Sequence, residues 1–164
     1  MNTLITLLDK ALSRFLISLM AFIVLVVTWQ VITRFLMSTP SSYTEELARF
    51  LLIWIGVLGS SYALRTRAHL GIDLLSTKLE GRAKGLLIIG IYLLVILFAL
   101  LIMVIGGIRL VSLTFNLDQI SASLGIKMGY IYLVLPLSGS IMIIYSSDFI
   151  LKALHLITHG EETS

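Results

Sequence analysis

Four long apolar stretches that contain no Asp, Glu, Lys or Arg organise this sequence. They cover residues 15–33, 50–64, 85–108 and 128–147, and they are 19, 15, 24 and 20 residues long. A helix crosses the roughly 30 Å hydrocarbon core of a bilayer with about 20 residues. Three stretches are therefore long enough to span a membrane, and the 15-residue stretch must extend into its flanking turns.

The pattern predicts an all-α integral membrane protein with four transmembrane helices. The predicted spans cover about residues 15–36, 43–66, 85–111 and 128–150. They form one transmembrane domain over residues 1–154, and residues 155–164 are expected to be a disordered cytoplasmic tail.

Two segments outside the spans are amphipathic. Apolar residues recur at helical spacing over residues 4–15, which predicts an interfacial helix leading into the first span. Residues 70–84 interleave leucines with charged residues and suit a short helix lying along the headgroups. Lys78, Arg82 and Lys84 in this middle loop can reach lipid phosphates.

The second span is expected to begin before its apolar stretch. Ser42 and Glu45 have the spacing of a capping box, directly behind Pro40. Glu45 and Arg49 are four residues apart with the acid first, which is the favourable order on a helix. Both Glu45 and Glu46 lie at the positive end of the helix dipole. Local helix structure alone could therefore explain all three charges.

Composition excludes several classes of function. Apolar residues make up 58% of the chain, charged residues 13%, and the mean hydropathy is +1.03. The absence of cysteine excludes disulfides, thiolate zinc sites and dithiol redox chemistry. All three histidines lie outside the apolar stretches, so no pair of them can hold a haem between helices. We expect no metal or other cofactor in this chain, and the net charge of +3 does not argue for nucleic acid.

The basic residues predict the orientation. Eight of the 12 Lys and Arg residues fall before the first span, in the middle loop and after the fourth span, and four fall on the other side. By the positive-inside rule, both termini and the middle loop of this multi-pass protein are cytoplasmic.

No predicted span carries an ionisable side chain at membrane depth. An ion-coupled carrier normally keeps such a group there, and small drug exporters keep a glutamate where this first span offers only Gln30. Gly56, Gly59 and Ser60 lie on neighbouring faces of the second span, so a neighbouring backbone can approach closely. That neighbour could belong to this chain or to another subunit.

The most specific signal is an ordered set of residues in the second and fourth spans and the middle loop. It comprises Thr44-Glu45-Glu46-Leu47-Ala48-Arg49-Phe50, then Trp54, Gly59, Arg65, Arg67, His69 and Asp73, and finally Tyr132, Pro136 and Gly139. This set resembles the small membrane subunit of the tripartite ATP-independent periplasmic (TRAP) transporters, over residues 34–150. Two departures, Ala68 before the histidine and Lys127-Met128-Gly129 without a proline, affect only loop geometry.

The resemblance implies a non-catalytic scaffold. In such systems a periplasmic solute-binding protein captures a carboxylate-bearing solute, and a large multi-span membrane subunit moves it in an elevator motion coupled to sodium. The small subunit holds the static part of the large one and offers part of the docking surface. Any sodium site is expected in the large subunit, and sialic acid is the first candidate for the solute, ahead of C4-dicarboxylates and sugar acids.

The resemblance also assigns residues to two sites. A partner or docking interface would comprise Glu45, Glu46, Arg49, Trp54, Gly59 and Pro136. A cluster at the cytoplasmic end would comprise Arg67, His69 and Asp73. A capped helix start and a headgroup-facing cluster explain the same charges about as well.

Two other classes of function stay open at this point. One is a self-sufficient small four-helix transporter that assembles as an oligomer. The other is a membrane anchor for a redox enzyme.

Overall fold

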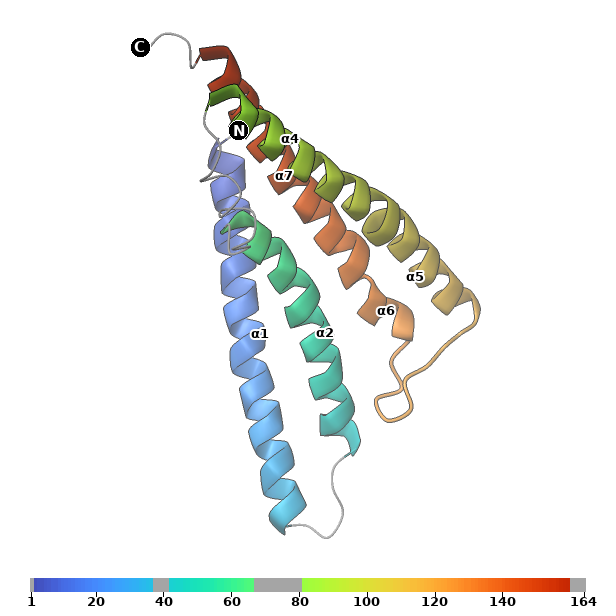
Figure 1. The fold of residues 1–164 in the computed structure, drawn as a ribbon. Helices are drawn as coiled ribbons and strands as arrows, with labels where there is room; N and C mark the ends of the chain where they lie inside the picture. The colour runs from blue at the N-terminus through green and yellow to red at the C-terminus, as the bar shows by residue number, and fades with distance from the viewer. Residues whose placement is uncertain (1, 37–41, 67–80, 160–164) are drawn as a thin grey trace.

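The computed structural model describes residues 2–36, 42–66 and 81–159, and helices account for nearly all of them. The helices are α1 (Asn2–Leu36), α2 (Ser42–Arg65), α4 (Gly81–Phe98), the π-helix η1 (Ala99–Gly106), α5 (Gly107–Asn116), α6 (Met128–Tyr132) and α7 (Val134–His159) (Figure 1). No strand occurs in these ranges, which confirms the all-α prediction.

Four stretches of helix are long and apolar enough to cross a membrane, as predicted. They are Ile5–Leu36, Ser42–Arg65, Gly85–Asn116 and Met128–Leu154. The expected N-terminal interfacial helix and the first span form one continuous helix, because no Gly or Pro interrupts residues 2–36. Of the amphipathic helix expected over residues 70–84 in the middle loop, residues 70–80 lie outside the described residues.

The fourth helix continues further than the sequence analysis expected. Residues 155–159 are helical, whereas the sequence predicted a disordered tail from residue 155. No Gly or Pro breaks the helix before Gly160, so the apolar pattern carries it on. Residues 160–164 lie outside the described part of the chain.

Pro136 explains a break in the fourth span. Proline has no backbone N–H to donate to the carbonyl four residues earlier, which here belongs to Tyr132, and its ring clashes with that carbonyl. The chain accordingly divides into α6 and α7 at Leu133. On the facing helix, Gly107 lies so close that a Cβ there would be 2.9 Å from Pro136 Cδ.

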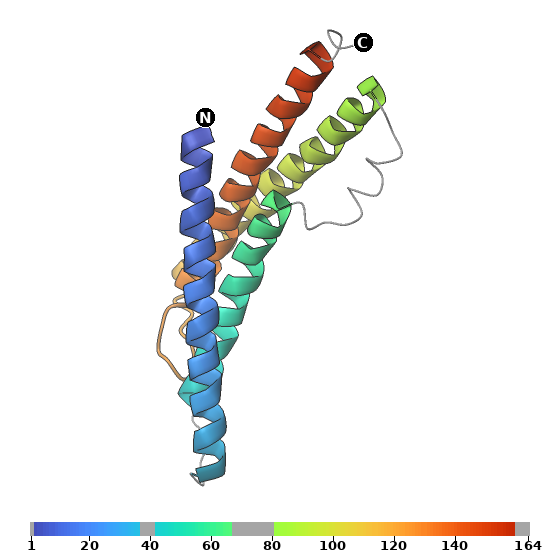
Figure 2. The ribbon, with the colours of Figure 1, turned by 90° about the vertical axis from the view of Figure 1, so that its left-hand side faces the viewer.

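The helices form two antiparallel pairs that meet along α2 and α7. One pair is α1 with α2, and the other is α7 with the continuous α4–η1–α5 helix. In Figure 1 the two pairs diverge away from the end that carries the termini, and Figure 2 shows both termini at that same end. We call this the terminal end, and the opposite end, which carries the loop of residues 117–127, the loop end.

The contact between the pairs is closed by small polar residues and buried apolar ones. The Oγ atoms of Ser61 and Ser138 are 2.6 Å apart, and Ser138 Oγ donates to the Val57 carbonyl at 2.7 Å. Leu58 and Val134 are almost fully buried beside them. Interhelical hydrogen bonds of this kind hold membrane helices together where the hydrophobic effect cannot.

Candidate functional site

A network of four charged side chains joins α1, α2 and α7 at the terminal end. Arg65 donates from Nε to Asp9 Oδ2 at 3.0 Å and from Nη1 to Asp148 Oδ2 at 3.2 Å. Lys152 Nζ donates to the same Asp148 oxygen at 2.7 Å. The Asp148 side chain is only 4% exposed, and that of Arg65 is 22% exposed. The network contains two acids and two bases, so its formal charge is zero.

Aromatic rings flank the guanidinium of this network. Arg65 Cζ lies 5.6 Å from the ring centroids of both Tyr145 and Phe149. Phe149 in turn stacks on Tyr92 with 4.7 Å between centroids, which links the network to α4. Cation–π contacts stabilise a guanidinium that has left bulk water. The terminal ion network, Asp9, Arg65, Asp148 and Lys152, therefore fastens the helices at this end.

This network was not predicted from the sequence. The cytoplasmic-end cluster that the resemblance implies, Arg67, His69 and Asp73, lies outside the described residues, as does Lys78. Arg82 and Lys84 belong to the first two turns of α4, and their side chains are not described. The sequence did contain a signal for the network, since Arg65 and Asp148 directly follow apolar stretches and Asp9 precedes the first one, which places all three at the same end of the four spans.

A second polar site lies at the loop end, where Glu46 holds the loop of residues 117–127. Its Oε2 accepts the backbone N–H of Ser123 at 2.8 Å and that of Leu124 at 2.9 Å. Ser121 Oγ also accepts from the Leu124 N–H, at 3.2 Å. Glu46 therefore satisfies loop amides 77 and 78 residues away, and we call this contact the loop anchor.

The loop itself closes on its own backbone. Ser121 N–H donates to the Ile126 carbonyl at 2.9 Å, and Met128 N–H donates to the Gln119 carbonyl at 2.9 Å. Gly125 takes a φ of +67°, a conformation that glycine adopts without strain. The loop is thus a defined hairpin.

An exposed ion pair ties the two arms of the loop together. Lys127 Nζ lies 3.0 Å from Asp118 Oδ1. The hydrogen bond to the Asp118 carboxylate, together with its negative charge, raises the pKa of Lys127 above its ordinary value. The pair contributes fully below the ordinary lysine pKa and is lost as the pH rises through the raised value. It is therefore intact throughout the physiological range.

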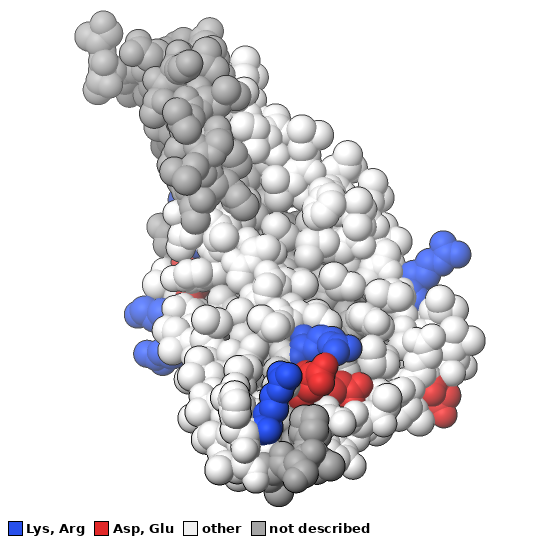
Figure 3. All heavy atoms as spheres, turned by 60° about the horizontal axis from the view of Figure 1, so that its bottom comes forward, with Lys and Arg blue, Asp and Glu red and all other residues white. Residues whose placement is uncertain are grey.

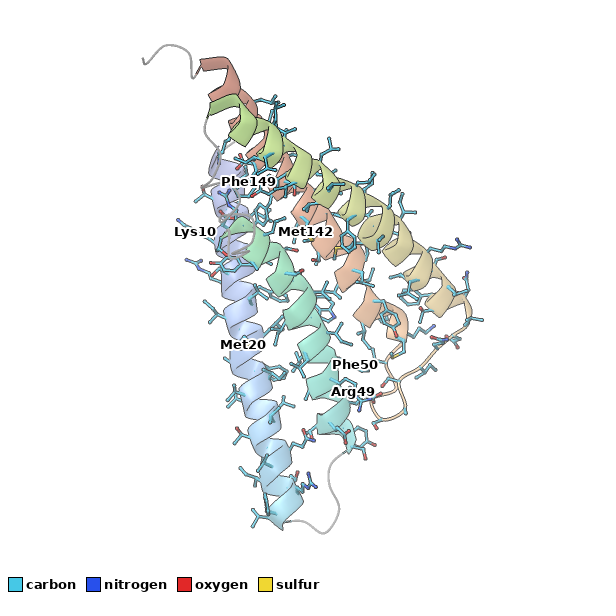
Figure 4. The ribbon with its side chains drawn as sticks, viewed as in Figure 1. Lys10, Met20, Arg49, Phe50, Met142 and Phe149 are labelled. Atoms are coloured by element: carbon cyan, nitrogen blue, oxygen red, sulfur yellow. The ribbon has the colours of Figure 1, made fainter. Side chains whose placement is uncertain are left out.

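Glu45 and Glu46 are adjacent in sequence but differ in their contacts. Glu45 Oε1 accepts a hydrogen bond from Arg49 Nη2 at 3.2 Å, with both side chains more than 60% exposed, as their spacing predicts. Glu46 faces the loop instead. Figure 3 brings the loop end forward and shows acidic and basic side chains intermixed there, and Figure 4 labels Arg49 and Phe50 on α2 near this end.

The apolar members of the predicted interface lie apart from these charges. Trp54 is half-buried and meets Phe15 of α1 edge to face, with 6.3 Å between centroids. Gly59 is also half-buried, and a Cβ there would meet nothing within 4 Å. Pro136 packs against Gly107 within the chain. The predicted interface residues therefore do not form one cluster.

An apolar hollow opens between α2 and the η1–α5 helix, with α7 at its floor. Its volume is about 670 Å³. The lining residues are Gly56, Val57, Ser60, Phe98, Ile102, Met103, Gly106, Gly107, Leu110, Leu135 and Met142. Met142, labelled in Figure 4, lies on α7. In this hollow, unlike in the terminal ion network, no lining residue is charged.

Comparison with known proteins gives consistent similarities. A family model for the DctQ component of the tripartite ATP-independent periplasmic transporters matches residues 23–156. The chain is 30% identical over 146 residues to the sialic acid TRAP transporter small permease protein SiaQ of Vibrio cholerae, covering 86% of this chain and 80% of that protein. It is 25% identical over 161 residues to a putative TRAP transporter small permease protein of Haemophilus influenzae, covering 98% of each.

A third relative is a longer protein. The chain is 26% identical over 136 residues to the isethionate TRAP transporter permease protein DctMQ of Oleidesulfovibrio alaskensis. The match covers 78% of this chain but only 21% of that protein. In this relative the matched segment is joined to a much longer permease polypeptide.

Proposed function

This chain belongs to the DctQ component family of the tripartite ATP-independent periplasmic transporters, and on that premise we propose that it is a non-catalytic scaffold for the large membrane subunit. It is a multi-pass protein of the inner membrane, and its family consists of transporter subunits and not of enzymes. Small permease subunits of this family work with a large permease subunit and a periplasmic binding protein.

One observation carries the scaffold proposal: the apolar stretches of the four spans contain no charged side chain that could serve coupling. Residues 15–33, 50–64, 85–108 and 128–147 contain no Asp, Glu, Lys or Arg. The buried acid Asp148 is compensated by Arg65 and Lys152 within the terminal ion network. A group that exchanged sodium or a proton against a solute would need a free charged state at membrane depth. We therefore assign sodium coupling to the large subunit.

The proposal includes an orientation. The eight-to-four distribution of basic residues favours cytoplasmic termini, which makes the loop end periplasmic. Single cysteines at Lys10 and Asp118 test this in intact cells, because the native chain has no cysteine. An impermeant thiol reagent should label position 118 and leave position 10 unlabelled, and the reverse pattern would contradict the orientation.

With that orientation, the hairpin of residues 117–127 becomes part of the docking surface for the solute-binding protein. Leu117, Ile120 and Ile126 are exposed on it, at 59%, 55% and 41%. The loop also carries Asp118 and Lys127, which favours an aqueous location where lipid does not cover those apolar side chains. Exposed apolar side chains beside charges are typical of a surface that meets another protein.

We propose an organic acid as the solute of the complete system, with sialic acid as the first candidate. The support is the similarity to SiaQ of Vibrio cholerae. The identity to the permease of an isethionate system is only slightly lower, at 26%. Measured uptake therefore has to decide between the candidate solutes. Competition of labelled sialic acid uptake by other acids would rank the candidates.

Reconstitution into liposomes tests the scaffold. This chain alone should transport nothing, whereas the complete system with an inward sodium gradient should accumulate solute. Omitting this chain should abolish uptake or leave the large subunit unstable. Accumulation by liposomes that hold only this chain would overturn the scaffold and favour the self-sufficient transporter, and co-purification with a redox enzyme would favour the anchor.

A further inference from the structure

We propose that the apolar hollow between α2 and η1–α5 is the seat of one transmembrane helix of the large subunit. This inference rests on the scaffold function proposed above and adds to it the surface that the large subunit occupies. Three features carry it: the space left by glycines, the absence of polar demand in the hollow, and the depth at which it lies.

The walls of the hollow leave room for a close backbone approach. A Cβ added to Gly56 on α2 would meet nothing within 4 Å, and one added to Gly106 would meet only the carbonyl of Leu101 on its own helix, at 3.6 Å. Gly139 and Gly107 are different, because a Cβ at either would clash with a neighbouring helix. The chain thus uses Gly107 and Gly139 for its own packing, whereas Gly56 and Gly106, which also line the hollow, are left without such a contact.

The lining of the hollow presents no charged side chain and no unpaired hydroxyl to an occupant. Ser60, the one hydroxyl among the lining residues, has its Oγ hydrogen-bonded to the Val57 carbonyl of its own helix at 2.7 Å. Met103 and Met142 are only 8% and 9% exposed, while Ile102 at the rim is 60% exposed. Methionine fills irregular space and adapts to the shape of a partner. An apolar helix with small and branched side chains matches this lining.

The depth of the hollow restricts the occupant to something within the membrane. Gly56 lies near the middle of the second apolar stretch, and Ile102 lies well inside the third. At that depth only a transmembrane segment or lipid acyl chains can enter. A segment gains packing against the recessed walls, which acyl chains match less well because they are flexible.

The relatives indicate which protein supplies that segment. In the DctMQ permease of Oleidesulfovibrio alaskensis, a segment like this chain is continuous with the remainder of a permease protein, of which it makes up about a fifth. That arrangement holds the two parts beside one another in the membrane. By comparison, Leu25 on α1 is 68% exposed and does not line the hollow.

A filled hollow is the first test. Gly56→Leu places a large side chain at the wall of the hollow, at a position where a Cβ meets nothing within 4 Å. Gly90→Leu is the matched control, since a Cβ at exposed Gly90 also meets nothing within 4 Å and Gly90 does not line the hollow. Overfilling a packed contact should lower capture of the co-expressed large subunit by about tenfold or more for G56L, with G90L as wild type. Equal capture by both variants would overturn the seat.

Photo-crosslinking gives an independent readout that does not require a weakened complex. A photoreactive phenylalanine analogue at Ile102 should form an adduct with the large subunit in the intact complex, and the same analogue at Leu25 should not. If the subunits co-purify but the adduct forms at Leu25 alone, or position 102 reacts only with lipid, the seat is wrong while the scaffold stands. If the wild-type subunits fail to co-purify, the proposed function fails and the seat fails with it.

Discussion

Replacing Arg65 by glutamine should destabilise the folded chain more than any exposed charge substitution. Arg65 is the only side chain that contacts both Asp9 and Asp148 in the terminal ion network. Without it, the 4% exposed Asp148 keeps Lys152 as an ion-pair partner, and Asp9 loses its ion pair with Arg65. Breaking a buried pair from one side costs about 3–5 kcal/mol, because it leaves a charge without compensation.

The location of the network sets the expected value within that range. The Asp9 side chain is 26% exposed and lies at the terminal end of the helices. Water can therefore solvate its unpaired charge in part, which lowers the cost of losing Arg65. We expect a loss of about 3 kcal/mol, which corresponds to roughly 6–12 °C in melting temperature for a chain of this size. Arg49→Gln is the matched control, because its ion pair with Glu45 is mostly exposed and such pairs contribute at most about 1 kcal/mol.

Thermal stability in detergent gives the measurement. Each variant is heated in steps, and the fraction that stays monodisperse is followed by size-exclusion chromatography. A loss of stability for R65Q no larger than that for R49Q would refute the stabilising role of the terminal ion network. The double variant R65Q/D148N should lose less stability than the sum of the losses of the two single variants, by about 0.5–3 kcal/mol, because the two residues share one interaction.

Two further substitutions test close contacts. Glu46→Ala should speed amide hydrogen exchange in the loop of residues 117–127, because the Ser123 N–H loses its carboxylate acceptor and the Leu124 N–H keeps only Ser121 Oγ. Glu45→Ala should leave exchange there unchanged, and equal exchange in both variants would contradict the loop anchor. Gly139→Ala should destabilise the chain by about 1–3 kcal/mol, since its Cβ would lie 2.7 Å from Met103 Cβ, whereas Gly90→Ala should be neutral or slightly stabilising; a neutral G139A would show that the packing relaxes.

The spans were predictable because the membrane imposes a simple rule on the sequence. A helix in lipid must be apolar over about 20 residues, and each of the four stretches meets that demand alone or with its flanking turns. The Glu45–Arg49 pair was predictable for a similar reason, since it depends only on a spacing of four residues. Both predictions need no knowledge of how the helices pack.

Contacts between helices could not be predicted from the sequence, because they depend on how each helix is rotated about its axis and on where the helices cross. Glu46 looks like a helix-start acid in the sequence, and only the packing of α2 beside the loop of residues 117–127 makes it an acceptor for amides of that loop. The π-helical turns of η1 change which residues face α7, and no periodicity rule locates such turns in an all-apolar stretch. The hollow follows from the same geometry.

The packing also bears on whether this chain could move a solute by itself. Two candidate pathways within one copy run between α2 and α7 and through the hollow. The first route is closed by Leu58, Val134, Ser61 and Ser138, whose side chains are 0–1% exposed and whose hydroxyls bond one another and the Val57 carbonyl. The second route offers an organic anion no donor or cation at mid-depth, and burying an unpaired carboxylate in such surroundings is prohibitively costly. The described fold therefore suits a partner helix far better than a charged solute.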